Sequence, residues 1–381
     1  MNIKSLLLGS AAALVAVSGA RAADAVVVAE PEPMEYVRVC DVYGTGYFYI
    51  PGTETCLRVG GYVRFDINGG DLLTAFDTYD TNARFSLQVS TASETELGTL
   101  RTYVETRFNY ANGGNAVGES FIASDPEDPV DDTGVSLNFA WIQLGGFRVG
   151  KDESLFTTFP GYAGNVIKDD QVVPFGPYDT NLISYTADFG NGFSAAVSVE
   201  EGSGSDEIDS YVPNVVGGLK YTGGWGGITG VAAYDANNEE FAGKVRVDFT
   251  VNDAFSAFVM GGYKTDDGEV QDGSEADDFD FADGTNFYGN WQGGDDDVRG
   301  GGDGFAVWAG ASYVLTPQAT INGQVSYDEG ENFQANLNVS YEVVPGFKIT
   351  PEVVYGANFD NDVSDDDDDA FGGVLRFQRS F

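Results

Sequence analysis

The sequence has no histidine, only two cysteines, and 19 lysine and arginine residues against 60 aspartate and glutamate residues. Without histidine, the chain cannot form a Ser-His-Asp or Cys-His catalytic group, a histidine-ligated zinc site or a histidine proton relay. The formal net charge of −41 excludes nucleic acid as a partner, because phosphate backbones are bound by clustered lysine and arginine. Because prolines number only 12 and 42% of residues are hydrophobic, the chain does not belong to the disordered class. The 51 glycines and 13% aromatic residues favour strands and turns.

The N-terminus has the three parts of an export signal. Lys4 supplies a positive charge, an apolar run of about 12 residues follows, and residues 20–22 (Ala-Arg-Ala) match a cleavage site of small residues. The run is shorter than the roughly 20 residues that a membrane-spanning helix needs. We therefore interpret residues 1–22 as a signal peptide that is cleaved near Ala22. Its removal takes away Lys4 and Arg21 and no acid, so the mature chain has 17 bases, 60 acids and a charge of −43.

The two cysteines both lie in the exported part of the chain. Cys40 and Cys56 have 15 residues between them, and an exported protein meets an oxidising compartment. An even number at close spacing favours a disulfide, which would stabilise this loop by about 3 kcal/mol, over two free thiols. We therefore expect residues 23–55 to form an N-terminal segment that contains a disulfide-closed loop.

Beyond residue 22, no apolar run is long enough for a membrane helix, and apolar and polar residues instead alternate with a period of two. In residues 57–67, for example, Val63 and Phe65 fall on one face while Arg64 and Asp66 fall on the other. The pattern predicts sixteen strands, near residues 56–68, 82–93, 98–110, 134–144, 146–152, 181–189, 192–201, 213–222, 228–235, 242–252, 254–264, 305–315, 318–328, 332–342, 347–358 and 370–381.

Three features favour a closed membrane barrel over a soluble sandwich, which would also alternate. The segments are long, and ten tilted residues span roughly 25 Å, the height of the apolar band of an outer-membrane barrel. Short turns alternate with connections that are mostly long and rich in glycine and aspartate, although those near 236–241 and 329–331 are brief. Phe381 ends the last strand on its apolar face. Because lipid offers no partner to a free strand edge, residues 56–381 are expected to form an all-β, transmembrane antiparallel barrel.

Several segments resemble the porins of alphaproteobacteria. These are residues 23–33 (ADAVVVAEPEP), 36–40 (YVRVC), 48–64 (FYIPGTETCLRVGGYVR), 97–103 (LGTLRTY) and 181–193 (NLISYTADFGNGF). The resemblance covers nearly the whole chain. It implies a sixteen-stranded, homotrimeric barrel in the outer membrane of a Gram-negative bacterium, surrounded by lipid and lipopolysaccharide. It also implies a water-filled pore that passes small hydrophilic solutes and ions.

In general porins, the third long loop folds into the barrel and narrows it, and the segment from Asp152 to Thr180 fits this role by order and length. The acids expected at this constriction are Asp152, Glu153, Asp169 and Asp170. The bases expected on the opposite wall are Arg64, Arg84, Arg101 and Arg107, with Lys151 at a position that resembles a basic constriction residue of general porins. Alternatively, the arginines only pair with Asp66 and Glu105 within the wall. For Arg107, Arg148 and Lys151, the sequence does not decide between the lumen face and the lipid face of the wall, because bulges at Gly145, Gly146 or Gly150 would shift the alternation.

Three other segments resemble metal- or cofactor-binding motifs but lack residues or flanking elements that those motifs require, so neither a metal nor a cofactor is expected. Residues 278–284 approach the start of an EF-hand, but the spacing, the final glutamate and the flanking helices are missing. Residues 113–120 have the spacing of a phosphate-binding loop with Glu119 in place of the lysine, and residues 190–195 imitate a dinucleotide motif in front of a strand. The acidic loops are better explained as solvated segments, with loose binding of divalent ions left open.

The function that we predict is a general diffusion porin with no catalytic activity and a mild preference for cations. One alternative is a substrate-specific channel, which would need an aromatic track along the lumen; Tyr62 and Tyr103 are its only signs. Another is a surface adhesin or structural protein of the outer membrane that uses the long loops.

Overall fold

The computed structural model describes residues 38–74, 78–112, 132–266, 286–293, 302–359 and 369–381. Its contacts divide the chain into Met1–Val39 and Cys40–Phe381, and the description that follows concerns the second unit. The signal peptide lies outside the described residues. So do the motifs at 113–120 and 278–284, and most of the acidic clusters of the long loops.

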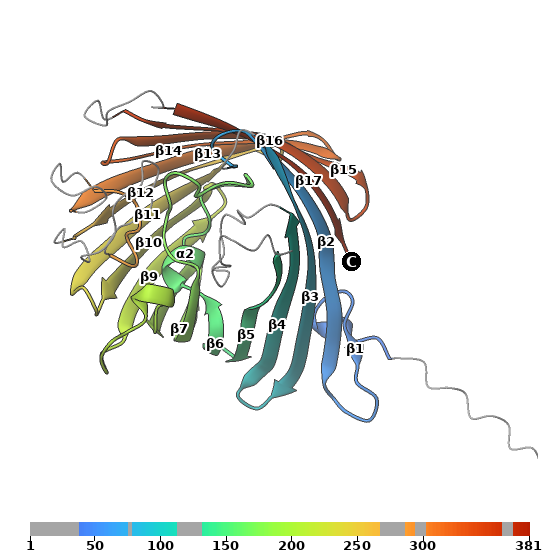
Figure 1. The fold of residues 1–381 in the computed structure, drawn as a ribbon. Coiled ribbons are helices and arrows are strands. Elements are labelled where there is room, and N and C mark those ends of the chain that lie inside the picture. The colour runs from blue at the N-terminus through green and yellow to red at the C-terminus, as the bar shows by residue number, and fades with distance from the viewer. Residues whose placement is uncertain (1–37, 75–77, 113–131, 267–285, 294–301, 360–368) are drawn as a thin grey trace, which may run out of the picture. The chain divides into compact units, whose positions relative to one another are not determined.

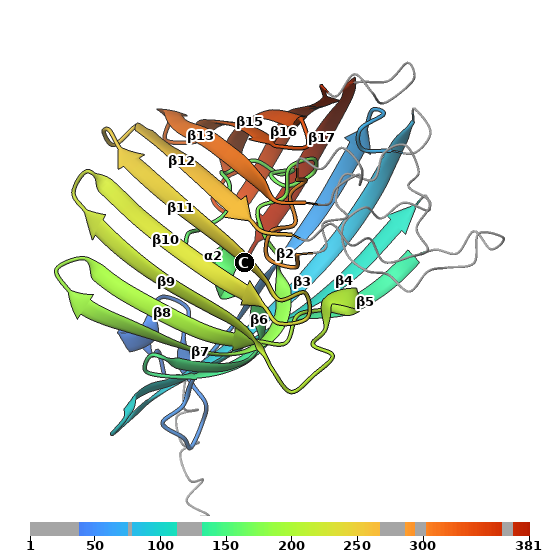
Figure 2. The ribbon, with the colours of Figure 1, turned by 90° about the vertical axis from the view of Figure 1, so that its left-hand side faces the viewer.

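Sixteen of the described strands form one closed antiparallel ring (Figures 1 and 2). Each strand pairs with the next, and the last pairs with the first through Gly373–Ser380 against Tyr62–Gly69. The strands are β2 (Cys56–Gly69), β3 (Tyr79–Thr95), β4 (Gly98–Asn112), β5 (Asp132–Leu144), β6 (Phe147–Glu153), β7 (Asp179–Gly190), β8 (Phe193–Glu200), β9 (Asn214–Gly223), β10 (Gly226–Asp235), β11 (Glu240–Thr250), β12 (Phe255–Lys264), β13 (Gly304–Thr316), β14 (Ala319–Asp328), β15 (Asn332–Val344), β16 (Phe347–Asn358) and β17 (Asp369–Ser380). The prediction of a closed sixteen-stranded barrel is confirmed, because each predicted segment overlaps one strand.

The remaining described elements are short: η1 (Asp41–Tyr43), β1 (Phe48–Tyr49), α2 (Leu155–Thr158) and η2 (Gly204–Asp206). β1 pairs with the start of β2, and the predicted disulfide joins Cys40 to Cys56. The two cysteines are buried together with Tyr47 and Ala92, so the disulfide fixes a small lobe on β2 and β3. None of the helices among the described residues has the length and apolarity to cross a membrane.

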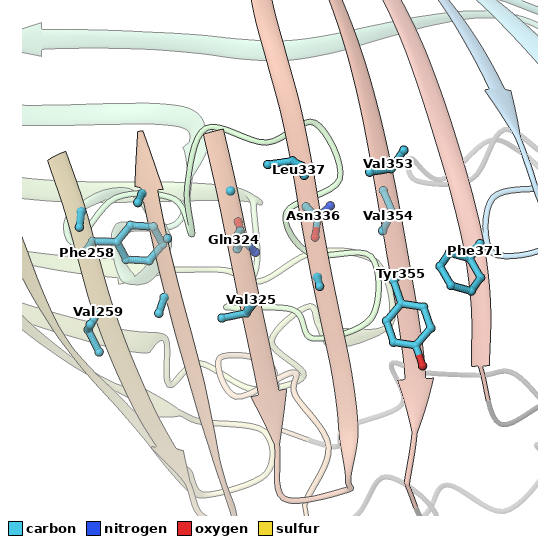
Figure 3. A pocket seen from close by; sticks show the side chains of 16 residues that line it. Phe258, Val259, Gln324, Val325, Asn336, Leu337, Val353, Val354, Tyr355 and Phe371 are labelled. Atoms are coloured by element: carbon cyan, nitrogen blue, oxygen red, sulfur yellow. The ribbon is translucent and has the colours of Figure 1, made fainter. Parts of the chain in front are cut away.

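The wall has two different faces, and its outer face is apolar. On β2, the side chains of Val63 and Phe65 are 53% and 39% exposed, whereas the inward Tyr62 is 8% exposed. Figure 3 shows the same arrangement on β12–β17, where exposed side chains such as Val325 and Leu337 surround small residues and form a shallow apolar hollow of about 670 Å³. In water, such a continuous apolar surface would be unfavourable, but hydrocarbon is a suitable solvent for it.

The ring closes at the C-terminus. The backbone N–H of Phe381 donates to the carbonyl of Gly61 at 3.0 Å, and the N–H of Gly61 donates to the carbonyl of Phe381 at 3.1 Å. Gly61 has φ +154°, and a Cβ atom there would lie 2.0 Å from the carbonyl oxygen of Ser86. This position therefore accepts only glycine while the three strands stay in register.

The register resolves the open question about bulges. β5 and β6 pair without interruption from Leu144 and Phe147 to Ala140 and Lys151, so no bulge occurs at Gly145, Gly146 or Gly150. The register shift in this region lies between Glu105 and Thr106 of β4, opposite β5. Arg148 and Lys151 consequently lie on opposite faces of β6.

Candidate functional site

The segment between β6 and β7, residues 154–178, crosses the interior of the barrel; we call it the constriction loop. Although its ends are attached to β6 and β7, it bonds to strands on the other side of the ring (Figure 1). Glu352 of β16 accepts hydrogen bonds from the backbone N–H groups of Ile167 at 2.5 Å and Lys168 at 2.9 Å. Gln334 of β15 accepts one from Val172 at 2.7 Å. The prediction of an inward-folded loop is therefore confirmed.

Glu200 of β8 anchors the start of the constriction loop. Its carboxylate accepts hydrogen bonds from the Ser154 hydroxyl at 2.7 Å and the Leu155 backbone N–H at 2.9 Å, at the N-terminus of α2. The Tyr288 hydroxyl donates to the same carboxylate at 3.1 Å. Because Tyr288 belongs to the segment 286–293, one buried side chain connects the wall, the constriction loop and a second loop.

Apolar side chains from the two loops pack together inside the barrel against the wall. Fully buried members of this core are Phe156, Val172, Val173, Phe175, Tyr288, Trp291, Met260 and Trp308. The indole N–H of Trp308 donates to the carbonyl of Val173 at 3.1 Å, and the Lys244 ammonium donates to the carbonyl of Phe175. These contacts fill the interior on the side of β8–β14. The charged interior residues described next come from the other side, β17 and β2–β6.

Four arginines occupy the inner face of β17 and β2–β4. Arg64 and Arg84 are direct cross-strand neighbours; Arg64 donates to the neutral amide of Gln378 at 2.9 Å, and Arg84 to Asn109 at 2.6 Å. Two others pair with wall carboxylates; for Arg107 this is the arrangement that the alternative interpretation expected, whereas Arg376 was not among the predicted arginines. These pairs are Arg107 with Glu105 at 2.9 Å, and Arg376 with Asp66 at 2.8 and 2.9 Å.

Arg101 and Lys151 lie apart from this group. Arg101 stacks over the ring of Tyr43 at 6.0 Å, beside the disulfide lobe. It is six residues along β4 from Arg107, a distance of roughly 20 Å at the usual rise of a strand. Lys151 shares its strand face with the exposed Phe147 and pairs with Asp179, the first residue of β7, directly after the constriction loop.

The predicted acids divide into two groups. Asp152 is buried and accepts a hydrogen bond from Arg148 at 2.5 Å, and Glu153 accepts one from the hydroxyl of Tyr162. Asp169 and Asp170 lie in the middle of the constriction loop. Burial, together with the charge of Asp170, raises the pKa of Asp169 well above its ordinary value, while the charge of Arg376 partly opposes this rise. Burial also lowers the pKa of Lys168.

Arg376 and Lys168 are site residues that the sequence interpretation missed. The alternation of β17 carried the signal for Arg376, because Leu375 and Phe377 on either side belong to the apolar row. Lys168 lies within the loop that was identified, beside two aspartates. The electrostatic neighbours of Lys168 include Asp170, Arg376 and Asp66, so the middle of the loop faces β17 and β2.

Comparisons with known proteins agree with this architecture. A family model described as "Porin subfamily" matches residues 24–374. The chain is 50% identical to porin Omp2b of Brucella neotomae and 51% identical to porin Omp2b of Brucella canis, in each case over the full length of both proteins.

Two solved structures share the fold at low sequence identity. The outer membrane channel DcaP of Acinetobacter baumannii has a TM-score of 0.63 and 15% identity, and the match covers 87% of this chain and 99% of that one. An anion-selective porin from Comamonas acidovorans has a TM-score of 0.53 and 12% identity, over 86% of this chain and all of the other. At these identities the likeness concerns the fold alone.

Proposed function

The chain belongs to the porin family and forms a channel of the outer membrane for passive diffusion of small hydrophilic solutes, and we propose that its narrowest point lies between the constriction loop and the wall of β17 and β2–β4. The observation that carries this proposal is the placement of the loop. Glu352 and Gln334 accept hydrogen bonds from backbone N–H groups of the loop and hold one side of it, and this supports the proposal that the loop carboxylates face the wall arginines.

The two sides of this constriction carry opposite charges. Arg64, Arg84, Arg107 and Arg376 supply the positive wall, and Asp169 and Asp170 of the constriction loop, with Glu153 at the end of β6, supply the negative side. Opposed charges across a narrow opening create a transverse field in which water and polar solutes orient. An apolar solute would have to displace that ordered water, so the pore favours hydrophilic molecules.

The other predicted site residues receive supporting roles. Arg101 and Asp152 line the wider part of the lumen toward the short turns. Lys151 pairs with Asp179 and so joins β6 to the start of β7, at the base of the constriction loop. The mature chain is proposed to begin after cleavage near Ala22 and to assemble as a homotrimer within lipid and lipopolysaccharide, as expected for this family.

The proposed selectivity is a mild preference for cations, since the mature chain has a charge of −43. The test is to purify the protein in detergent, insert it into planar bilayers and measure the reversal potential in a KCl gradient. A potential of the sign for K⁺ permeation, shrinking as salt is raised because exposed charges are screened over about 10 Å at 0.1 M, is the expected result. A clear preference for chloride would contradict the proposed selectivity, and the absence of any conductance would contradict the channel itself.

The lumen also carries an observation that favours a degree of substrate preference. The ring of Tyr103 lies 5.6 Å from the rings of both Phe139 and Trp141, and the guanidinium of Arg148 lies 4.2 Å from the Trp141 ring. Such a cluster of aromatic rings with one stacked arginine gives part of the wall an apolar, solute-binding character. A specific channel is therefore the second candidate function.

A further inference from the structure

A second feature of the interior is a cavity of about 210 Å³ beside α2, toward the end of the barrel where the short turns lie. Strands β5, β6, β7 and β9 form its walls, and α2 with Phe159 covers it. Its apolar lining consists of Leu155, Phe159 and Leu182, and the rest is mostly polar. None of the constriction arginines lines it, but Glu153 does, so the cavity adjoins the constriction on the side away from those arginines.

Small residues on the wall make room for this cavity. Gly218 of β9 lies directly under Phe159, since a Cβ atom on Gly218 would come within 2.5 Å of the Phe159 ring. The neighbouring inward residue on β8 is Ala196, which pairs with Gly218. The Phe159 ring in turn contacts Lys220, whose ammonium lies 4.7 Å from the ring centroid.

The two cations of the cavity differ in their partners. Arg148 is fully engaged, because it bonds to Asp152 at 2.5 Å and to Gln143 at 2.8 and 3.1 Å while it stacks on Trp141. Lys220, by contrast, forms no ion pair with any carboxylate in the part of the chain that the structure describes; its contact is the face of Phe159. Asp248, the carboxylate that acts on Lys220 electrostatically, is itself paired with Arg246 at 2.8 Å, so this half-buried ammonium leaves one positive charge available to a solute.

The surroundings of Lys220 restrict the kind of anion. Asp152 and Glu153 also line the cavity; Arg148 offsets Asp152, and Lys220 can balance one negative charge of a solute, while a second or third would be repelled. The hydroxyls of Thr158, Ser184 and Thr186 line it as well, and they can pair with hydroxyl groups of a ligand. The apolar side can contact the carbon skeleton.

We propose that this cavity is a binding subsite for a small organic monoanion, a carboxylate that carries several hydroxyl groups, with Lys220 as the residue that binds the carboxylate. The inference rests on the proposed diffusion function, because a solute reaches the cavity through the lumen. It adds a local preference for one class of solute to a pore whose overall charge favours cations.

The test measures single-channel currents in planar bilayers with gluconate as the probe. Gluconate is expected to interrupt the current in a saturable, concentration-dependent manner, while glucose, which lacks the charge, and citrate, which has three, are expected to be much weaker. The variant Lys220→Gln should weaken the apparent affinity for gluconate about tenfold, the effect of losing one charged hydrogen bond in a hydrated site. Lys220→Arg should retain most of it.

Lys348→Gln is the matched control. Lys348 pairs across strands with Gln378, which bonds to Arg64, so Lys348 faces the lumen on the opposite wall near a short turn. This control should leave the block by gluconate unchanged. Migration of both variants as folded barrels on non-denaturing gels shows that the barrel has folded.

Each other outcome has a defined meaning. A channel that conducts normally without saturable block by gluconate would overturn this inference and leave the porin function intact. An equal loss of block in Lys220→Gln and Lys348→Gln would also overturn it, because general lumen charge would then be responsible. The absence of conductance in the unmodified protein would instead contradict the proposed function.

Discussion

Glu352→Ala is expected to release the constriction loop from the wall. The carboxylate of Glu352 is 3% exposed and accepts two backbone hydrogen bonds from the loop, from Ile167 and Lys168. It also accepts one from Asn338 at 2.8 Å and a longer one from Asn336 at 3.3 Å. A hydrogen bond to a charged group contributes about 1.5–3 kcal/mol, so the two loop bonds together contribute about 3–6 kcal/mol to docking. Their loss shifts the balance between docked and released loop by a factor of roughly 100 or more.

Single-channel recording provides the assay for this variant. A released loop no longer narrows the lumen, so Glu352→Ala should show a larger conductance and stronger current noise than the unmodified protein. Glu352→Gln keeps one acceptor oxygen and should show a smaller change. Glu342→Gln is the matched control, because Glu342 lies on the adjacent strand and accepts a hydrogen bond from the Gly346 N–H at a short turn, away from the loop.

The outcome that would refute this reasoning is specific. If Glu352→Ala conducts with the same amplitude and noise as the unmodified protein, the wall contacts do not hold the loop. If Glu342→Gln changes the conductance equally, the effect comes from lumen charge and not from docking.

Three further predictions concern charge, the lobe and closure. Asp169→Asn should reduce the K⁺ preference in a KCl gradient. The carboxyl group of Asp169 is charged above its pKa and neutral below it, and this pKa is raised. As the pH is lowered, the K⁺ preference of the unmodified protein should therefore begin to fall at a higher pH than it would with an ordinary carboxyl group. A pH profile unchanged in Asp169→Asn would contradict this assignment. Replacing Cys40 and Cys56 by serine should destabilise the lobe by about 3 kcal/mol, and so speed protease cleavage within residues 41–55 while the barrel stays intact; reductant should reproduce the effect, and equal cleavage rates would refute it. Gly61→Val should lower the yield of folded barrel on non-denaturing gels, since its Cβ would clash with Ser86, whereas Gly230→Val, with no atom within 4 Å of its Cβ position, should fold; equal yields would count against the closure argument.

The wall of this barrel could be predicted from the sequence because each strand contacts two different solvents. That requirement acts on every second residue, so alternation located all sixteen strands, while the resemblance to general porins identified, by order and length, the loop that folds inward. The disulfide followed from two cysteines close together in an exported segment. These features depend on local sequence and general physical chemistry.

The details of the site depend on which residues become neighbours across the ring. Arg101 and Arg107 share a face of β4, yet their positions along the strand direct them to the disulfide lobe and to Glu105, respectively. Alternation also pointed to Arg376, but its importance depends on the loop that lies against β17. The aromatic residues of segment 286–293 gave no local pattern, and their burial requires partners from the constriction loop and from several strands.

The apolar core within the barrel has a consequence for assembly. Nine of its 19 members are carried by wall strands, such as Met260 on β12 and Trp308 on β13, so the loops lack these partners until those strands have joined. Strand pairing must therefore precede the seating of both loops. We therefore expect a newly inserted ring to be wider than the finished pore until both loops have settled.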